Sequence, residues 1–167
     1  MNINFSDFKP TKANLKSWIN ELKKPEHFTL YLVLLQVLLL LILGGAILVY
    51  TPIGVLIQVM GIFLAFWAFR QINPAHFKLR PEVNVNATLI KTGPYKYVRH
   101  PLYASIFIIV IPGIIEQLSV FNTIVFLVLG ALLIFKIELE EKFLSAHFNE
   151  QYEEYKKTTW KLIPKVY

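Results

Sequence analysis

The sequence predicts an all-α integral membrane protein with about four transmembrane helices arranged as two hairpins. Three observations lead to this prediction. Hydrophobic residues make up 55% of the 167 residues and charged residues only 17%, compared with about a quarter in soluble domains. Four apolar segments occur, at 28–50, 53–69, 101–115 and 120–137. The short turns between the members of each pair contain no Lys or Arg.

The lengths of these segments set how many can cross a bilayer. A spanning helix needs about 20 apolar residues, with a range of about 17 to 25. The first, second and fourth segments are long enough, whereas the third is short and contains Pro112. Only Thr51 and Pro52 separate the first two segments, and residues 116–119 separate the last two. Each pair is therefore expected to form a tight antiparallel helical hairpin.

The segment 11–24 precedes the apolar segments and has an amphipathic pattern. Leu15, Trp18, Ile19 and Leu22 recur at helical spacing, and lysines cover much of the remaining surface. This pattern favours a helix that lies in the lipid headgroup layer, with a packed helix of a soluble protein as the alternative.

The distribution of positive charge predicts the topology. All 17 Lys and Arg residues lie in the N-terminal segment, the connection 70–100, the end of the fourth apolar segment or the C-terminal tail. An even number of spans puts these regions on one face, and the positive-inside rule makes that face cytoplasmic. We therefore expect a multi-pass membrane protein with both termini in the cytoplasm. The net charge of +6 then calls for no nucleic-acid partner.

An ionisable pair stands directly before the third apolar segment. Pro101 suits the first turn of a helix, so His100 is expected near the helix N-cap. The free N–H groups of a helix start favour an anion, and Arg99 adds a full positive charge. Tyr103 lies on the same side as His100. These residues predict an anion-binding corner, although Arg and His at a membrane edge can also simply reach toward the lipid headgroups.

A second polar cluster follows the fourth apolar segment. Lys136 and Glu140 are four residues apart and share a helix face, with Glu141 beside them. Two carboxylates here can be a solvated helix end. However, acidic residues at a cytoplasmic helix C-terminus oppose both the helix dipole and the local surface potential. That conflict favours a functional role, such as accepting hydrogen bonds from a diol or an amine.

Two stretches carry a family resemblance. "LIKTGPYKYVRHPLY" followed by "EEKFLSAHFNEQYEEYKKTTWKLIP" resembles the isoprenylcysteine carboxyl methyltransferases and the related phospholipid methyltransferases, integral membrane enzymes that use S-adenosylmethionine. The resemblance covers residues 87–164. The family pattern is met by Gly93, Pro94, Tyr95, Arg99, His100, Pro101, Tyr103, Glu140, Glu141, Phe148, Tyr152, Tyr155, Ile163 and Pro164. Asn149 replaces the usual Gly after Phe148, and Asn also tolerates the left-handed conformation that ends a helix.

The resemblance implies a single domain. Its parts are an N-terminal segment, 1–26, the first hairpin, 27–71, and a region 72–167 that holds the cofactor pocket and the catalytic residues. The implied S-adenosylmethionine-binding residues are Ala87, Thr88, Leu89, Ile90, Tyr95, His100, Pro101, Leu102, Tyr103 and Glu140. The implied catalytic residues are Arg99, His100, Tyr103 and Glu141.

The acceptor is expected to be a lipophilic molecule or a membrane lipid. At the position where the prenylcysteine enzymes carry an Arg that contacts the acceptor, this chain has Lys136. Lys lacks the planar fork that grips a carboxylate, so a carboxylate and an amine acceptor both stay open.

The sequence is also compatible with other functions. The alternatives to a methyltransferase are a membrane lipid reductase that uses NADPH and a membrane scaffold whose basic face binds anionic lipid. The chain has no cysteine, and its four histidines are scattered, so no metal site is predicted. The sequence leaves the oligomeric state open.

Overall fold

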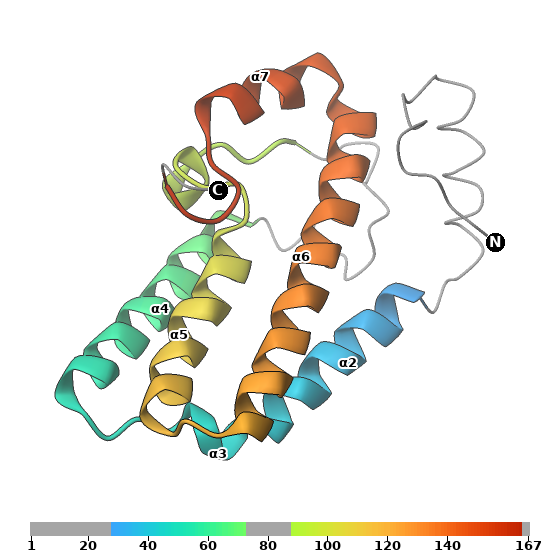
Figure 1. Ribbon diagram of the computed structural model, residues 1–167. Coiled ribbons are helices and arrows are strands. Elements are labelled where there is room, and N and C mark those ends of the chain that lie inside the picture. Colours follow the sequence, from blue (N-terminus) through green and yellow to red (C-terminus); the bar gives the residue numbers. More distant parts are fainter. Residues whose placement is uncertain (1–27, 73–87, 165–167) are drawn as a thin grey trace.

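The computed structural model describes residues 28–72 and 88–164, and the regular structure in these residues is helical (Figure 1). The predicted interfacial helix at 11–24 and most of the 70–99 connection lie outside the described residues. The elements are α2 (Phe28–Ile42), α3 (Gly44–Ile47), α4 (Pro52–Gln71), the 3-10 helix η3 (Gly93–Lys96), α5 (Pro101–Glu116), α6 (Val120–Phe148) and α7 (Glu150–Thr158).

Two helices in the described residues, α4 and α6, are long and apolar enough to cross a membrane. With 20 residues and a rise of about 1.5 Å per residue, α4 spans about 30 Å, the thickness of the hydrocarbon core. Most apolar side chains of both helices point outward, unlike those of a core helix in a soluble protein. The helices α2 and α5 are also apolar but shorter. The all-helical prediction is therefore confirmed, with two long and two shorter apolar helices.

The first apolar segment is not one continuous helix. It was expected to run over 28–50, but α2 ends at Ile42 and the four-residue α3 follows. The interruption falls at Leu43, directly before Gly44 and Gly45 of α3, and glycine has a low helix propensity. The chain is extended from Leu48, and α4 then begins after Thr51, whose side chain accepts a hydrogen bond from the Gly54 N–H.

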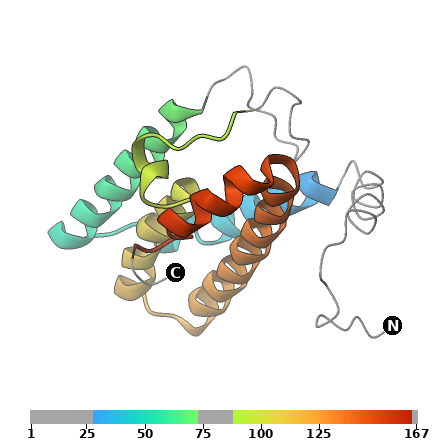
Figure 2. The same cartoon turned by 90° about the horizontal axis from the view of Figure 1, so that it is seen from above.

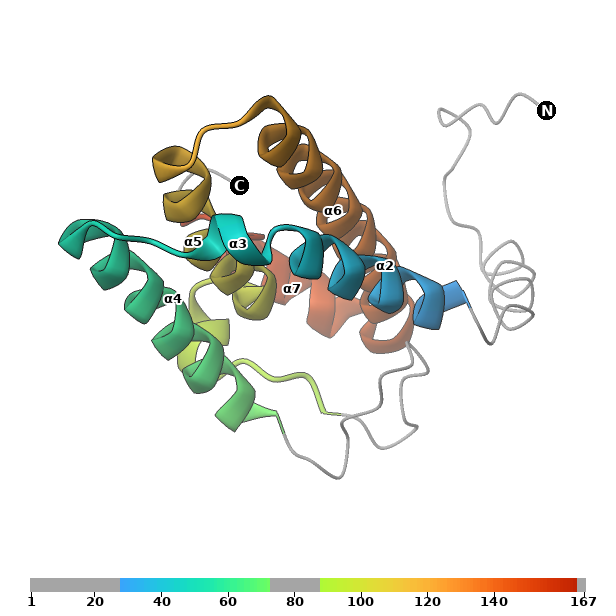
Figure 3. The ribbon, with the colours of Figure 1, turned by 90° about the horizontal axis from the view of Figure 1, so that it is seen from below.

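The helices pair differently from the two predicted hairpins. α4 packs chiefly along α5, whereas α2 packs against α6, as the views from the side and from below show (Figures 1 and 3). Gly61 permits the close approach of α4 to α5, since a Cβ atom there would come within 2.8 Å of the Ile109 side chain. Small residues at helix contacts are a common means of packing helices in membranes.

One end of the bundle is closed by the α3 region. Gly113 of α5 lies so close to α3 that a Cβ atom would meet the Ala46 carbonyl oxygen at 2.1 Å. At the end of α5, the Glu116 carboxylate accepts hydrogen bonds from the Tyr50 N–H, at 2.7 Å, and from the Thr51 hydroxyl. These contacts hold the link between α2 and α4 against the end of α5.

The opposite end is formed by the start of α5, the end of α6, and α7. α6 continues beyond the apolar part of its sequence and ends at Phe148, and the next residue, Asn149, has a positive φ of 48°. The positive φ agrees with the expectation that Asn is tolerated at this position, but the ψ of −121° differs from that of the left-handed helical conformation. From there α7 runs back across the end of the bundle (Figure 2).

The largest apolar core lies between α2, α3, α5 and α6. It comprises the buried residues Leu39, Leu43, Ala46, Val110, Ile114, Val125, Leu129, Leu132 and Leu133. This core sets the distance between α5 and α6, and so it positions the polar side chains at their ends.

Candidate functional site

A short backbone pairing fixes the segment before α5. Val98 forms a parallel bridge with Trp160, which follows α7. The N–H of Arg99 donates to the Trp160 carbonyl at 2.8 Å, and the N–H of His100 donates to the Lys161 carbonyl at 3.1 Å. The tail after α7 therefore holds Arg99 and His100 beside the end of α6.

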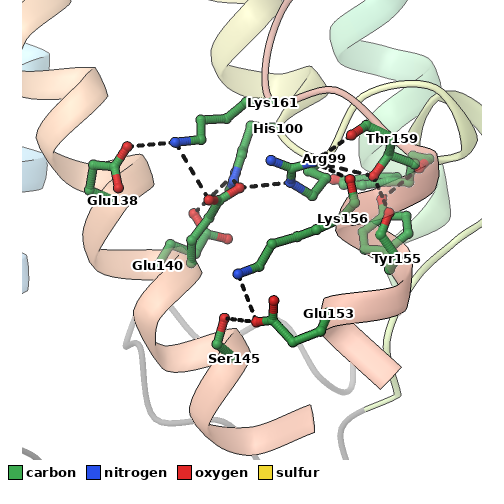
Figure 4. A network of polar contacts seen from close by, with 12 residues as sticks. Arg99, His100, Glu138, Glu140, Ser145, Glu153, Tyr155, Lys156, Thr159 and Lys161 are labelled. Atoms are coloured by element: carbon green, nitrogen blue, oxygen red, sulfur yellow. Dashed lines mark hydrogen bonds and ion pairs between the residues drawn. The ribbon is translucent and has the colours of Figure 1, made fainter. Parts of the chain in front are cut away.

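The Arg99 side chain joins three elements. Its Nε donates to Glu141 Oε1 of α6 at 2.7 Å, and its Nη1 donates to the Thr159 carbonyl at 2.5 Å (Figure 4). Only 9% of the Arg99 side chain and 11% of the Glu141 side chain are exposed. Because each charge has its partner within the protein, this pair acts as an internal clamp.

His100 lies between Glu140 and Glu141 of α6. Its Nε2 is 3.3 Å from Glu141 Oε1, and its Nδ1 is 3.8 Å from Glu140 Oε2. The His100 side chain is almost completely buried, and its ring centroid is 5.8 Å from that of Tyr103. The start of α5 and the end of α6, which the sequence predicts to meet, are thus in direct contact.

Glu140 is more exposed than Glu141, with 47% of its side chain accessible against 11%. Two tyrosines are near it. The Tyr103 hydroxyl interacts with the Glu140 carboxylate. Burial, and then the negative charge of Glu140, raise the pKa of Tyr95 above its ordinary value. Tyr95 is held in place through its carbonyl, which accepts a hydrogen bond from the Tyr155 hydroxyl at 2.5 Å. Glu140 is therefore a carboxylate that still has access to ligands, surrounded by ordered aromatic groups.

Lys136 lies about one helical turn before Glu140 on α6. Its ammonium is 5.5 Å from the centroid of the Tyr103 ring. It also donates to the side-chain oxygen of Gln36 on α2. Lys136 thus lies at the border between the polar end of the bundle and its apolar interior.

The other predicted binding residues have simpler surroundings. Thr88, Leu89 and Ile90 lie in an irregular segment before η3, and within the described residues no hydrogen bond or ion pair links them to the glutamates. Pro101 is buried at the start of α5, and Leu102 follows it, half-buried. Ala87 lies outside the described residues.

Several residues of the site have no part in the sequence prediction. Lys161 donates to Glu138 Oε1 at 2.6 Å, and its Nζ is 3.6 Å from Glu141 Oε2. Thr159 accepts from Arg99 through its carbonyl oxygen. No local spacing could reveal these partners, because they come from the folding of the tail back onto α6. Gln36 did carry a signal, since a polar side chain inside an apolar helix is unusual and is often functional.

The hydroxyl of Tyr152 is a further polar group in this region. It is buried and has no hydrogen-bond partner in the part of the chain that the structure describes. Burial, and then the charge of Glu141, raise the pKa of Tyr152 above its ordinary value. The end of the bundle therefore holds carboxylates, cations, phenols and the free N–H groups of a helix start within a small region.

Comparison with known proteins gives a family for this arrangement. A model of the isoprenylcysteine carboxyl methyltransferase (ICMT) family matches residues 52–146, more than half of the chain. No curated protein and no solved structure matches the chain. The matched part runs from α4 through α5 and into the last turns of α6, so it includes Arg99, His100, Glu140 and Glu141. The chain therefore belongs to the isoprenylcysteine carboxyl methyltransferase family, as an integral membrane methyltransferase that uses S-adenosylmethionine.

Proposed function

We propose that this protein transfers a methyl group to a lipophilic acceptor at the cytoplasmic face of the membrane. The observation that carries the proposal is the position of His100, in contact with both Glu140 and Glu141. This contact brings the start of α5 and the end of α6 together at one end of the bundle. Family membership favours this activity over an NADPH-dependent reductase or a membrane scaffold.

The orientation of the protein follows from its charges. Described basic residues that belong to this end include Lys91, Lys96 and Arg99 before α5 and Lys156 and Lys157 on α7. The positive-inside rule places such residues in the cytoplasm. Both chain termini are then cytoplasmic, and a water-soluble cofactor reaches the site directly from the cytosol. In this scheme residues 72–167 form the cofactor-binding region of a single domain.

The side chains at this end fit S-adenosylmethionine. Glu140 is an accessible carboxylate, suited to accept hydrogen bonds from the amino group or the ribose hydroxyls. The N–H groups of Leu102 and Tyr103 precede the first hydrogen bond of α5, which runs from Ala104 to His100. They are suited to bind the carboxylate of the cofactor. Tyr95 and the half-buried Leu89 and Ile90 supply aromatic and aliphatic surface for the adenine.

The residues of the chain then serve mainly to position the reactants. S-adenosylmethionine supplies a methyl group carried on a positively charged sulfonium. Arg99 and Glu141 hold His100 and the start of α5 in place through their ion pair. Tyr103 lies between His100 and Lys136, at the boundary between the cofactor side and the acceptor side. Alignment of this kind can lower a barrier by roughly 7–11 kcal/mol.

Lys136 favours an acceptor with a carboxylate. A half-buried ammonium attracts an anion and repels a protonated amine. A carboxylate acceptor also needs no general base, whereas an amine acceptor has to lose a proton. The acceptor would come from the bilayer, with its apolar part among the helices and its carboxylate near Lys136.

A cofactor-binding measurement tests this proposal. The purified protein in lipid nanodiscs is titrated with S-adenosylmethionine by calorimetry, for wild type, Glu140→Gln and Glu138→Gln. Glu138 is a matched control, because it lies on the same helix and is equally accessible, at 46% of its side chain, but is paired with Lys161. Loss of hydrogen bonds to a charged group predicts a decrease in affinity of about ten- to a hundredfold for Glu140→Gln.

Two outcomes would contradict the proposal. Equal affinities in Glu140→Gln and wild type would remove Glu140 from the cofactor site. Absence of binding by the wild-type protein, together with no transfer of radiolabelled methyl to a membrane lipid extract or to a prenylcysteine analogue, would refute the activity itself.

A further inference from the structure

Gln36 places an amide within the apolar helix α2. The neighbouring residues are leucine and valine, in the stretch LVLLQVLLLL. α2 precedes residues 52–146, which the family model matches, so it lies outside the matched part. A polar side chain in such a helix requires a partner, because the bilayer interior offers no water.

The partner of Gln36 is Lys136. The Lys136 ammonium donates to Gln36 Oε1 at 2.5 Å, and this contact joins α2 to α6. An ammonium can only donate, so the amide oxygen has to face it. The amide nitrogen of Gln36, with two N–H groups, has no hydrogen bond to residues 28–72 or 88–164 and can donate to a second acceptor beside the same ammonium.

The pair lies where an acceptor would meet the cofactor site. Lys136 precedes Glu140 by four residues on α6, which is about 6 Å along the helix axis. The Lys136 ammonium is also 5.5 Å from the centroid of the Tyr103 ring, and that ring is 5.8 Å from the ring of His100. A continuous series of contacts therefore runs from α2 to the start of α5, through the side chains of Gln36, Lys136, Tyr103 and His100.

We propose that Gln36 and Lys136 together bind the carboxylate of a lipophilic acceptor, and that Gln36 is a specificity-determining residue supplied by α2. A lysine alone offers a point charge, whereas an arginine offers two parallel N–H donors. Here the ammonium of Lys136 supplies the charge and the amide N–H of Gln36 supplies the second donor. The two side chains from separate helices replace the fork of one arginine. This inference rests on the proposed function.

If Gln36 had a purely structural role, a different experimental result would be expected. Interhelical hydrogen bonds stabilise membrane helix pairs by about 0.6 kcal/mol on average. If Gln36 only joined α2 to α6, its loss would lower the thermal stability and affect every ligand of the site to the same extent. A role in carboxylate binding instead affects ligands according to whether they carry that carboxylate.

The test compares an acid with its neutral analogue. N-acetyl-S-farnesylcysteine serves as the substrate, and its primary amide, which cannot accept the methyl group, serves as a competitive inhibitor. Wild type, Gln36→Leu, Gln36→Glu and the control Gln58→Leu are measured in nanodiscs at saturating S-adenosylmethionine. Gln58 is a matched glutamine inside α4, where its amide nitrogen donates to the carbonyls of Ile47 and Ile109.

The expected result is a selective loss. Gln36→Leu raises KM for the acid about ten- to a hundredfold, the effect of losing a hydrogen bond to a charged group, with kcat and the Ki of the amide unchanged. Gln36→Glu raises KM further, because two carboxylates then meet at Lys136. Gln58→Leu lowers the melting temperature and leaves the ratio of KM to Ki as in wild type.

The outcomes that overturn the inference differ from those that overturn the function. If wild type methylates the acid and Gln36→Leu has the same KM, or if its KM and Ki change by the same factor, Gln36 has no role in specificity. If wild type methylates an aminophospholipid and not the acid, the acceptor class is wrong while methyl transfer remains. If wild type binds no S-adenosylmethionine, the proposed function itself fails.

Discussion

His100 Nε2 lies 3.3 Å from Glu141 Oε1, although the two residues are 41 positions apart in the chain. The same carboxylate oxygen accepts a hydrogen bond from Arg99 Nε at 2.7 Å. One buried oxygen thereby ties the start of α5 to the end of α6. Glu140, one residue before it, is left accessible to a ligand. In the proposed function the two neighbouring glutamates therefore have separate tasks, with Glu141 holding the structure together and Glu140 binding the cofactor.

The first prediction concerns the clamp formed by Arg99. Removing one partner of a buried ion pair leaves an uncompensated charge, so Arg99→Ala is expected to lower the free energy of unfolding by about 3–5 kcal/mol. Arg70→Ala is the control, since Arg70 is exposed at the end of α4, and surface substitutions usually change stability by less than about 0.5 kcal/mol. Chemical denaturation in detergent micelles measures both. Similar losses in the two variants would show that the Arg99 pair adds no stability.

A second prediction concerns cofactor affinity and His100. His100→Ala removes the side chain that faces both glutamates, and we expect it to abolish binding of S-adenosylmethionine in calorimetry. His147→Ala is the control, because His147 is exposed near the end of α6, the helix that carries Glu140 and Glu141, and packs against Phe148. Near-UV circular dichroism checks that both variants keep their tertiary packing. A folded His100→Ala protein with wild-type affinity would contradict the assignment.

The sequence predicted parts of the fold well, for a physical reason. The segments expected at 53–69 and 101–115 are α4 (Pro52–Gln71) and α5 (Pro101–Glu116), and a proline marks the start of each helix. Hydropathy predicted the helix boundaries wrongly in the first and the fourth segment, because it does not measure helix propensity. The first segment is interrupted at Leu43, before two glycines of low helix propensity, although all these residues are apolar. α6 continues to Phe148, because charged Glu and Lys are good helix formers.

The candidate site was predictable only where its residues belong to local motifs. The spacing around Arg99 and Glu140 made their side chains candidates, and the charge distribution placed both on one face. Thr159 and Lys161 could not be found in this way, since they reach Arg99 and Glu141 only when the tail folds back. The same holds for the contact of Gln36 with Lys136, 100 residues away. It depends on α2 packing against α6 and not against α4.

A third prediction concerns the contact between α5 and α3. A methyl group at Gly113 would meet the backbone of Ala46 and Ile47 at 3.0 Å or less. Backbone cannot easily move aside, so Gly113→Ala is expected to lower the free energy of unfolding by about 1–3 kcal/mol. Gly44→Ala is the matched control, because no atom lies within 4 Å of its added Cβ, and alanine favours a helix over glycine by up to about 1 kcal/mol. Thermal unfolding should therefore shift in opposite directions. A destabilised Gly44→Ala together with an unaffected Gly113→Ala would contradict the packing of α3 on α5.

The last prediction concerns alkaline pH and Tyr155. Burial raises the pKa of Tyr155 to about 12, whereas in an unfolded chain the pKa of tyrosine is about 10. Between these values the unfolded state loses a proton that the folded state keeps. The stability that Tyr155 contributes is therefore fully present below pH 10 and is lost as the pH rises toward 12, by at most about 1.4 kcal/mol per pH unit.

Tyr155→Phe tests this dependence. The variant lacks the titrating hydroxyl, so its free energy of unfolding should fall less steeply than that of wild type from pH 10 to 12. At neutral pH it should be less stable by about 1 kcal/mol, because the Tyr95 carbonyl loses its hydrogen bond. Denaturant titrations at a series of pH values give both quantities. Parallel curves for the two proteins would mean that the Tyr155 hydroxyl titrates alike in the folded and unfolded states, and would thus remove it from the contacts that hold η3 against α7.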